Sequence, residues 1–222
     1  MTISDFSFAE NPDPRCPVVL VLDASGSMGE PAPSGQLPIT ELNEGLRTLA
    51  TALNDDELAA RRVEIAVVTC AHEVTVANDF TVANLWTPPV LEPMGATPMG
   101  AALTRALDLL DQRKATYRAN GVSYYRPWIL LVTDGIPTDD VTAPAQRIRA
   151  AEASNSLAFF PVGIEGADLG LLSTLSTRTP LMMNGLRFRE LFVWLSASQS
   201  RVSASRPGET VPLPSPAGWA EV

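Results

Sequence analysis

The chain has few of the residues on which several common classes of protein depend. It contains two cysteines and one histidine in 222 residues, so a disulfide framework is not expected. Cys16 stands at the start of one apolar run and Cys70 near the end of another. If these runs form parallel strands, the two sulfur atoms lie too far apart to bond. We therefore expect two unpaired thiols, as is usual in the cytoplasm.

Long apolar runs and concentrated basic patches are also missing. No run approaches the roughly 20 apolar residues that span a bilayer. The first residues, MTISDFSFAENPDPR, lack the basic and apolar regions of a secretory signal. The net charge is −9, and the basic residues are scattered in ones and twos. We therefore expect a cytoplasmic protein whose partners are neither nucleic acids nor membranes.

Motifs of the common enzyme classes are absent or incomplete. The sequence has no Walker loop and no Gly-x-Gly-x-x-Gly. Asp23 follows a strand as in haloacid-dehalogenase-type phosphatases, but Ser25 replaces the second aspartate that would act as general acid. A serine hydrolase built on Ser27 would need His72 as its base, and the chain order of these residues differs from that of α/β-hydrolases. The sequence therefore predicts a protein that is not an enzyme.

Apolar β-branched runs alternate with segments of helical periodicity, which is typical of a parallel sheet covered by helices. Strands are predicted at residues 18–22, 63–69, 128–133, 157–162 and 181–183, with a short edge strand or hairpin at 74–76 and 80–82. Helices are predicted at residues 39–55, 98–114, 143–154, 167–174 and 188–198. The predicted fold class is α/β: Rossmann-like, doubly wound, with a mostly parallel six-stranded sheet flanked by helices on both faces.

Composition divides the chain into three parts. Residues 1–15 form a polar N-terminal arm, residues 16–204 a single domain, and residues 205–222 a Pro-rich tail. We expect the tail to be extended or disordered, with docking through Trp219 as an alternative.

The strongest local signal is Asp23-Ala-Ser25-Gly-Ser27, directly after the first predicted strand. An extended backbone points alternate side chains in the same direction, so Asp23, Ser25 and Ser27 can converge. Ligands of doubly wound sheets bind beyond the carboxyl ends of the strands, where the strand order reverses. Thr97, before a helix, and Asp134, after the strand at 128–133, should reach the same edge.

Together these five residues offer two carboxylates and three hydroxyls, the oxygen ligands that Mg²⁺ prefers. The sequence therefore predicts a site for one ion, Mg²⁺ or alternatively Mn²⁺ or Ca²⁺, with metal ligands Asp23, Ser25, Ser27, Thr97 and Asp134. Neutral hydroxyl ligands leave the cation electrophilic, which favours an Asp or Glu carboxylate from a protein partner.

Each segment also has a structural explanation. Asp-Ala-Ser-Gly-Ser is a plausible polar turn, and Asp134-Gly135 is an ordinary turn dipeptide. Thr97 and Pro98 suit the N-cap and first position of a helix. Asp139 and Asp140 are expected to cap the helix that follows them.

The segments DASGSMG, GATPMG and TDGIPTD resemble the metal-ion-dependent adhesion site of von Willebrand factor A domains. The resemblance implies that Ser25 and Ser27 ligate the metal through their hydroxyls and that Thr97 ligates in one state. It also implies that Asp23 and Asp134 act directly or through water. LNEGL, LVTDGIPTD, FFPVGI and FRELFVWLSAS are similar to stand-alone bacterial A domains of the tellurite-resistance type (TerY-like).

The resemblance implies a metal-dependent protein-binding module in a bacterial stress-response or signalling assembly, with kinase- or phosphatase-like operon partners. The loop over residues 30–38, beside the expected site, is longer than the family pattern predicts. Two alternatives stay open. One is a Mg²⁺-dependent phosphotransfer or hydrolytic enzyme that uses Asp23. The other is a metal-free scaffold that binds through the loop at 30–38 or through the tail.

Overall fold

A computed structural model describes residues 8, 11–216 and 218–221 of the chain. Its sheet has the strand order β3-β2-β1-β4-β5-β6-β7, and strands β1, β2, β4, β5 and β6 run parallel. The strands are β1 (Cys16–Asp23), β2 (Val63–Cys70), β3 (Val74–Val82), β4 (Trp128–Thr133), β5 (Ala158–Gly163), β6 (Leu181–Met183) and β7 (Ala220–Glu221). The predicted α/β fold with a mostly parallel sheet is thus confirmed.

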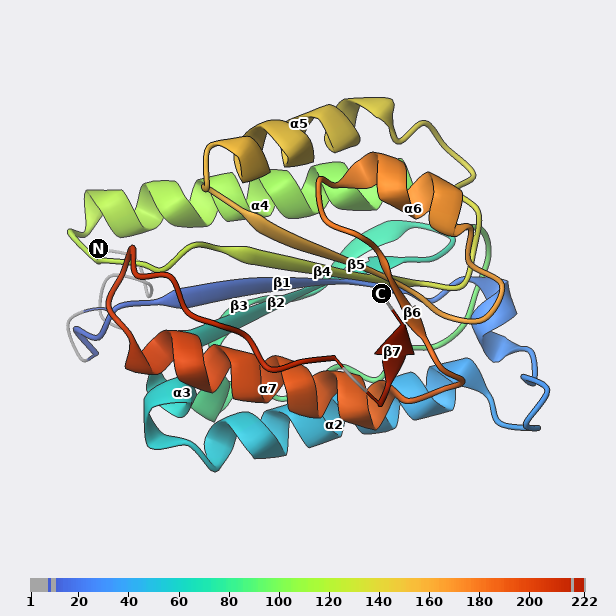
Figure 1. Ribbon diagram of the computed structural model, residues 1–222, viewed down its shortest axis with the longest axis horizontal. Coiled ribbons are helices and arrows are strands. Elements are labelled where there is room, and N and C mark those ends of the chain that lie inside the picture. The colour runs from blue at the N-terminus through green and yellow to red at the C-terminus, as the bar shows by residue number, and fades with distance from the viewer. Residues whose placement is uncertain (1–7, 9–10, 217, 222) are drawn as a thin grey trace.

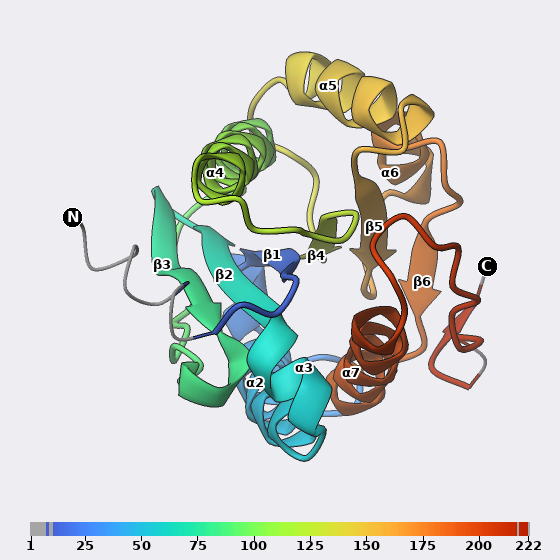
Figure 2. The ribbon, with the colours of Figure 1, turned by 90° about the vertical axis from the view of Figure 1, so that its left-hand side faces the viewer.

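Helices cover both faces of the sheet, as Figures 1 and 2 show. One face carries α2 (Pro38–Asn54), α3 (Glu57–Arg62) and α7 (Phe188–Ala204), and the other carries α4 (Met99–Ala119), α5 (Thr142–Ala153) and α6 (Leu169–Leu175). Short 3₁₀ turns are η1 (Gly26–Gly29) and η2 (Ala83–Leu85).

The central strand β1 divides the core into two parts because its side chains alternate. Val18, Leu20 and Leu22 pack with α2 and α7, whereas Val19 and Val21 pack with α4. All eight residues of β1 are buried, which explains why the strand reads as an unbroken apolar run. β1 therefore holds a fixed position in the middle of the sheet, and its carboxyl end places the residues that follow it.

Three elements refine or add to the sequence prediction. Of the two alternatives predicted for residues 74–82, the structure shows the edge strand and not the hairpin, and shifts in register against β2 near Val67 accommodate Asn78. The short helix α3 was not predicted; the Asp56 side chain caps it by accepting from the amides of Leu58 and Ala59. Strand β7 was not predicted either, and it pairs antiparallel with β6.

The tail residues before β7 pack against the domain. The Trp219 ring lies 5.6 Å from that of Trp194, and the Trp194 indole donates to the Pro214 carbonyl over 2.8 Å. The predicted N-terminal arm lies largely outside the described residues, and the boundaries at residues 15 and 205 stay predictions. Within the described part of the chain, no helix is both long and apolar enough to cross a membrane.

Both cysteines are buried and unpaired, as predicted. Cys16 lies at the first position of β1 and Cys70 at the last position of β2. Because these adjacent strands are parallel and in register from Cys16 to Asp23, the Cys16 thiol lies at their amino ends and the Cys70 thiol at their carboxyl ends.

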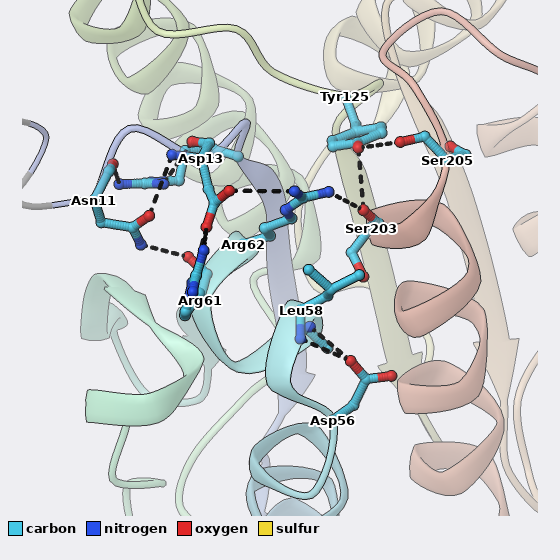
Figure 3. Close-up of polar contacts among 11 residues, drawn as sticks. Asn11, Asp13, Asp56, Leu58, Arg61, Arg62, Tyr125, Ser203 and Ser205 are labelled. Atoms are coloured by element: carbon cyan, nitrogen blue, oxygen red, sulfur yellow. Dashed lines mark hydrogen bonds and ion pairs between the residues drawn. The ribbon is translucent and has the colours of Figure 1, made fainter.

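Polar contacts at the amino edge of the sheet fasten the ends of several elements (Figure 3). Asp13, ahead of β1, forms ion pairs with Arg61 and Arg62 from the end of α3. The Tyr125 hydroxyl, ahead of β4, lies 2.6 Å from the Ser205 carbonyl at the end of α7. This edge is thereby fixed, and the opposite, carboxyl edge carries the predicted site.

Candidate metal centre

The five predicted ligands lie at the carboxyl ends of β1 and β4. The chain runs from β1 outward to β2 and β3 and then returns to β4 on the other side of β1. This reversal of strand order opens the crevice in which doubly wound sheets bind their ligands. Asp23 is the last residue of β1 and Asp134 directly follows β4, so the fold brings two distant carboxylates to one place.

The Asp23 carboxylate is buried and held on both sides. One oxygen accepts from the Ser25 amide over 2.9 Å, and the other accepts from the Thr133 hydroxyl over 2.6 Å. Thr133 is fully buried, and its hydroxyl also accepts from the Gly135 amide over 3.1 Å. Thr133 therefore orients Asp23, a role that the sequence analysis missed because a threonine at a strand end looks like any β-branched residue.

Hydroxyl groups connect the two carboxylates. The Ser25 and Ser27 hydroxyl oxygens are 3.0 Å apart, and the Ser27 hydroxyl donates to Asp134 Oδ1 over 3.0 Å. Ser25 is buried and Ser27 is exposed. The side chains thus form a continuous polar surface from the interior to solvent, which is what an accessible ion site requires.

Thr97 completes the group. A Cβ atom built at Gly135 would stand 3.2 Å from the Thr97 hydroxyl oxygen and 3.6 Å from Asp23 Oδ2. The two oxygens therefore lie on the same side of Gly135, and a side chain there would press into the space between them. The structure thus brings together all five residues, Asp23, Ser25, Ser27, Thr97 and Asp134.

Backbone hydrogen bonds hold the three loops against one another. The Gly26 amide donates to the Gly95 carbonyl over 3.0 Å, and the Met94 amide donates to the Ala24 carbonyl over 2.8 Å. The Thr138 amide donates to the Thr97 carbonyl over 3.0 Å. Each loop contacts a neighbour through main-chain atoms, so the positions of the side chains are set by the fold.

Asp139 corrects two expectations about helix capping. Its carboxylate accepts from the amides of Gly100 and Ala101, each over 2.8 Å, so it caps α4, not the helix that follows it. The N-cap position of α4 is Pro98 and not Thr97. Because Asp139 satisfies the first turn of α4, the Thr97 hydroxyl is not needed as a cap. Asp140 accepts from the Thr142 amide at the start of α5, as expected.

The electrostatics of the site favour a cation. Burial and the neighbouring charge of Asp23 raise the pKa of Asp134 to about 6, against the opposing effect of the hydrogen bond from Ser27. Two carboxylates thus approach each other with hydroxyls and amides as neighbours. Within the described ranges no group of three or more His, Cys, Asp or Glu is placed to hold a metal. The candidate set has only two carboxylates, and its hydroxyl-rich chemistry fits a hard ion such as Mg²⁺.

Comparison with known proteins assigns the chain to a family. The model of the von Willebrand factor type A domain matches residues 18–190. The chain therefore belongs to the von Willebrand factor type A domain family. In a comparison with curated proteins, no sequence matches the chain.

Solved structures share the fold at low sequence identity. A von Willebrand factor type A protein from Catenulispora acidiphila has a TM-score of 0.60 at 18% identity, covering 85% of this chain and 43% of that one. The pilus adhesin SpaC from Lactobacillus rhamnosus GG has a TM-score of 0.62 at 13% identity, covering 85% and 31%.

The proximal thread matrix protein 1 of the mussel byssus has a TM-score of 0.58 at 14% identity, covering 86% of this chain and 49% of that one. The chain thus spans less than half the length of each of these three proteins, and at these identities the likeness concerns the fold.

Proposed function

We propose that the chain is a metal-dependent protein-binding module. One divalent cation, Mg²⁺ or alternatively Mn²⁺ or Ca²⁺, binds to Asp23, Ser25, Ser27, Thr97 and Asp134, and a protein partner contributes an Asp or Glu carboxylate. The observation that carries this proposal is the convergence of five oxygen-bearing side chains from three separate loops at the switch point of the sheet.

Some residues of the site offer oxygen ligands to the cation, and others orient those ligands. Ser25 and Ser27 offer neutral oxygens, and Asp134, next to Ser27, offers the more solvent-accessible carboxylate. Thr133 and the Ser25 amide fix Asp23, so that carboxylate keeps one orientation. A bound cation supplies an electrophilic position for an incoming carboxylate. Hydroxyl ligands do not cancel its charge, which leaves that position attractive to an anion.

Exposed apolar side chains flank the site and favour a macromolecular partner. Ile136, two residues after Asp134, is 66% exposed, and Met94, three residues before Thr97, is 61% exposed. Methionine is enriched at protein interfaces and at binding surfaces that adapt to their partners. Domains of the von Willebrand factor type A family commonly act as adhesion or protein-binding modules, which supports the same conclusion.

For the biological setting we propose a bacterial cytoplasmic assembly of the tellurite-resistance type, for stress response or signalling, with kinase- or phosphatase-like partners. The support is the similarity of LNEGL, LVTDGIPTD, FFPVGI and FRELFVWLSAS to that group. Copurification from a bacterial host that carries the chain's neighbouring genes would test this setting. Recovery of no kinase- or phosphatase-like protein would count against it.

Catalysis is the alternative that the contacts favour least. Both Asp23 carboxylate oxygens accept hydrogen bonds within the domain, which lowers their nucleophilicity. The Ser27 hydroxyl contacts Ser25 and Asp134, and neither of these contacts is with a histidine base. Phosphatase and esterase assays test the point, and a turnover lost in Asp23→Asn would overturn the binding proposal.

Calorimetric titration with Mg²⁺ and Mn²⁺ tests the metal site directly. We expect heat of binding for the wild type and for Ser34→Ala, a matched control in the exposed loop at 30–38. Ser27→Ala should lose most of that heat because it removes one ligand. Equal heats for all three proteins would contradict the site.

Partner capture tests the second half of the proposal. The wild type, bound to a resin, should retain a protein from a lysate in Mg²⁺ and release it in chelator. Ser27→Ala should retain little in either buffer. Retention that is unchanged by chelator and by Ser27→Ala would favour the metal-free scaffold, which binds through the loop at 30–38 or through the tail.

A further inference from the structure

A cavity lies at the amino edge of the sheet, opposite to the carboxyl edge that carries the candidate metal centre. Its volume is about 720 Å³, within the range of small-molecule sites. Trp128 and Ala158, the first residues of β4 and β5, lie in its wall, and so do tail residues such as Leu213. The cavity therefore lies between the amino ends of two central strands and the tail.

The cavity is basic although the protein is acidic. Four of the sixteen Lys and Arg residues line it, together with one acid, Glu209, while the whole chain has a net charge of −9. The four basic residues are Lys114, Arg118, Arg126 and Arg178. Such a concentration attracts anions, because like charges on facing walls raise the local positive potential.

Only two of the four cations have an acidic partner among the described residues. Lys114 pairs with Asp111 over 2.7 Å, and Arg178 lies 3.4 Å from Glu152. Arg118 approaches the Tyr124 hydroxyl over 3.3 Å, and Arg126 donates to the Leu157 carbonyl over 2.7 Å. Neither of these two guanidinium groups forms an ion pair with a described carboxylate, although the charge of Glu152 acts on Arg126 from a greater distance.

Arg126 and Arg178 act on each other within the cavity. Burial lowers the pKa of Arg126, the positive charge of Arg178 lowers it further, and the negative charge of Glu152 opposes this shift. The Arg178 guanidinium stacks over the Phe160 ring at 5.0 Å from its centroid, which restricts its direction. A single guanidinium group can bind two phosphate oxygens through two parallel hydrogen bonds, so two such groups in one cavity offer several donors to a phosphate.

The walls of the cavity are fixed. Tyr125, in the wall, holds the end of α7 through its hydroxyl, as Figure 3 shows. The Trp194 indole, on the same helix, donates to Pro214 and so fastens the tail segment whose residues 208–213 form the outer wall. A cavity with fixed walls requires little ordering when a ligand binds.

We propose that this cavity binds a small molecule that carries two or more phosphate groups. Arg126 and Arg178 hold one phosphate group, and Lys114 and Arg118 on the α4 side attract the other. The site is independent of the metal centre, because the two share no residue and lie at opposite edges of the sheet.

Calorimetric titration with inorganic pyrophosphate tests the proposal. The protein is first treated with chelator, so that no divalent cation links pyrophosphate to the candidate metal centre. We expect the wild type to bind pyrophosphate and Arg126→Gln and Arg178→Gln each to bind it at least tenfold more weakly. Glu209→Gln should bind it severalfold more tightly, because it removes the one acid in the wall.

Two controls separate this site from general charge and from the metal centre. Arg47→Gln removes the same charge from an exposed pair on α2 and should leave the affinity unchanged, as should Ser27→Ala. Circular dichroism establishes whether each variant is folded. If Arg126→Gln does not fold, the affinity of Arg178→Gln, a variant of the more exposed arginine, decides the test. No binding by the wild type, an equal loss in Arg47→Gln, or tighter binding of citrate than of pyrophosphate would overturn the proposal.

Discussion

Carboxylates at the two edges of the sheet, buried for Glu64 and Asp23 and half-buried for Asp134, are stabilised by different partners. At the amino edge, Glu64 on β2 is fully buried and forms ion pairs with Arg15 over 3.0 Å and with Arg113 over 2.8 Å. At the carboxyl edge, Asp23 and Asp134 have hydroxyl and amide partners. The chain supplies its own cations for Glu64, whereas we propose that Asp23 and Asp134 bind a cation from solution.

The difference separates a structural carboxylate from a candidate binding carboxylate. A buried charge is strongly unfavourable unless it is paired, so a complete ion pair indicates a role in the fold. An incomplete one indicates a role that needs a further component. This comparison, and not the sequence motif alone, is why we regard Asp23 and Asp134 as a binding site.

The largest expected effect belongs to the amino edge. Glu64→Gln leaves the Arg15 guanidinium, which is fully buried, without its carboxylate and should destabilise the fold by about 3–5 kcal/mol. Urea denaturation measures this loss. Glu44→Gln, in an exposed pair with Arg47, is the matched control and should cost less than about 1 kcal/mol. Similar losses of stability in Glu64→Gln and Glu44→Gln would contradict the structural role of the buried ion pairs.

A smaller effect is expected where Thr133 supports Asp23. Thr133→Val keeps the shape but removes the hydroxyl that donates to Asp23 Oδ2, and a buried acceptor without its donor costs about 1–3 kcal/mol. Thr133→Ser keeps the hydroxyl and should retain metal binding, which Thr133→Val weakens. Denaturation and calorimetry read out the two effects, and equal metal affinity in both variants would exclude an orienting role.

Another carboxylate, that of Asp56, is stabilised by backbone amides and should show the smallest effect. Asp56→Ala removes the cap of α3 and should cost about 1 kcal/mol, while Asp56→Asn should cost less. The hydrogen bond from the Ala59 amide is the largest influence on the pKa of Asp56 and holds it below its usual value.

The sign of the pH dependence follows from that shift. The ionised form of Asp56 is favoured in the folded state, so its contribution is present above pH 3.8, the usual pKa, and is lost as the pH falls through the lower folded pKa. The stability difference between wild type and Asp56→Asn should therefore shrink towards pH 3. A difference that grows on acidification would contradict this account.

Much of the fold could be predicted from local sequence patterns, whereas the elements that were not predicted depend on contacts between distant parts of the chain. The buried runs at residues 16–22 of β1 and 128–132 of β4 are apolar throughout and could be predicted. Strand β7 could not, because two residues pair with β6 only after Trp219 packs against Trp194. Nor could the edge strand β3 be told from a hairpin, since its continuity depends on a shift in register against β2.

The same division applies to the site. Asp23, Ser25 and Ser27 share one turn, so their spacing could be recognised in the sequence. Asp134 was predicted from its place directly after a strand, and Thr97 from its place directly before a helix. Asp139 was assigned to the wrong helix, because its contacts with Gly100 and Ala101 cross between two loops. Thr133 was missed because only the paired strands bring its hydroxyl to Asp23.

The free energy of unfolding of Asp134→Asn, with and without Mg²⁺, tests the central claim most directly. Burial and Asp23 raise the pKa of Asp134 from 3.8 to about 6, so above pH 6 its ionised form opposes folding unless a cation is present. Without metal, at pH 7.5, Asp134→Asn should be more stable than wild type by about 1 kcal/mol, once solvent screening is allowed for.

With Mg²⁺ at 100 times its Kd, the wild type should gain about 2.7 kcal/mol and Asp134→Asn almost nothing. A variant that is less stable without metal and gains as much from Mg²⁺ as the wild type would contradict the account.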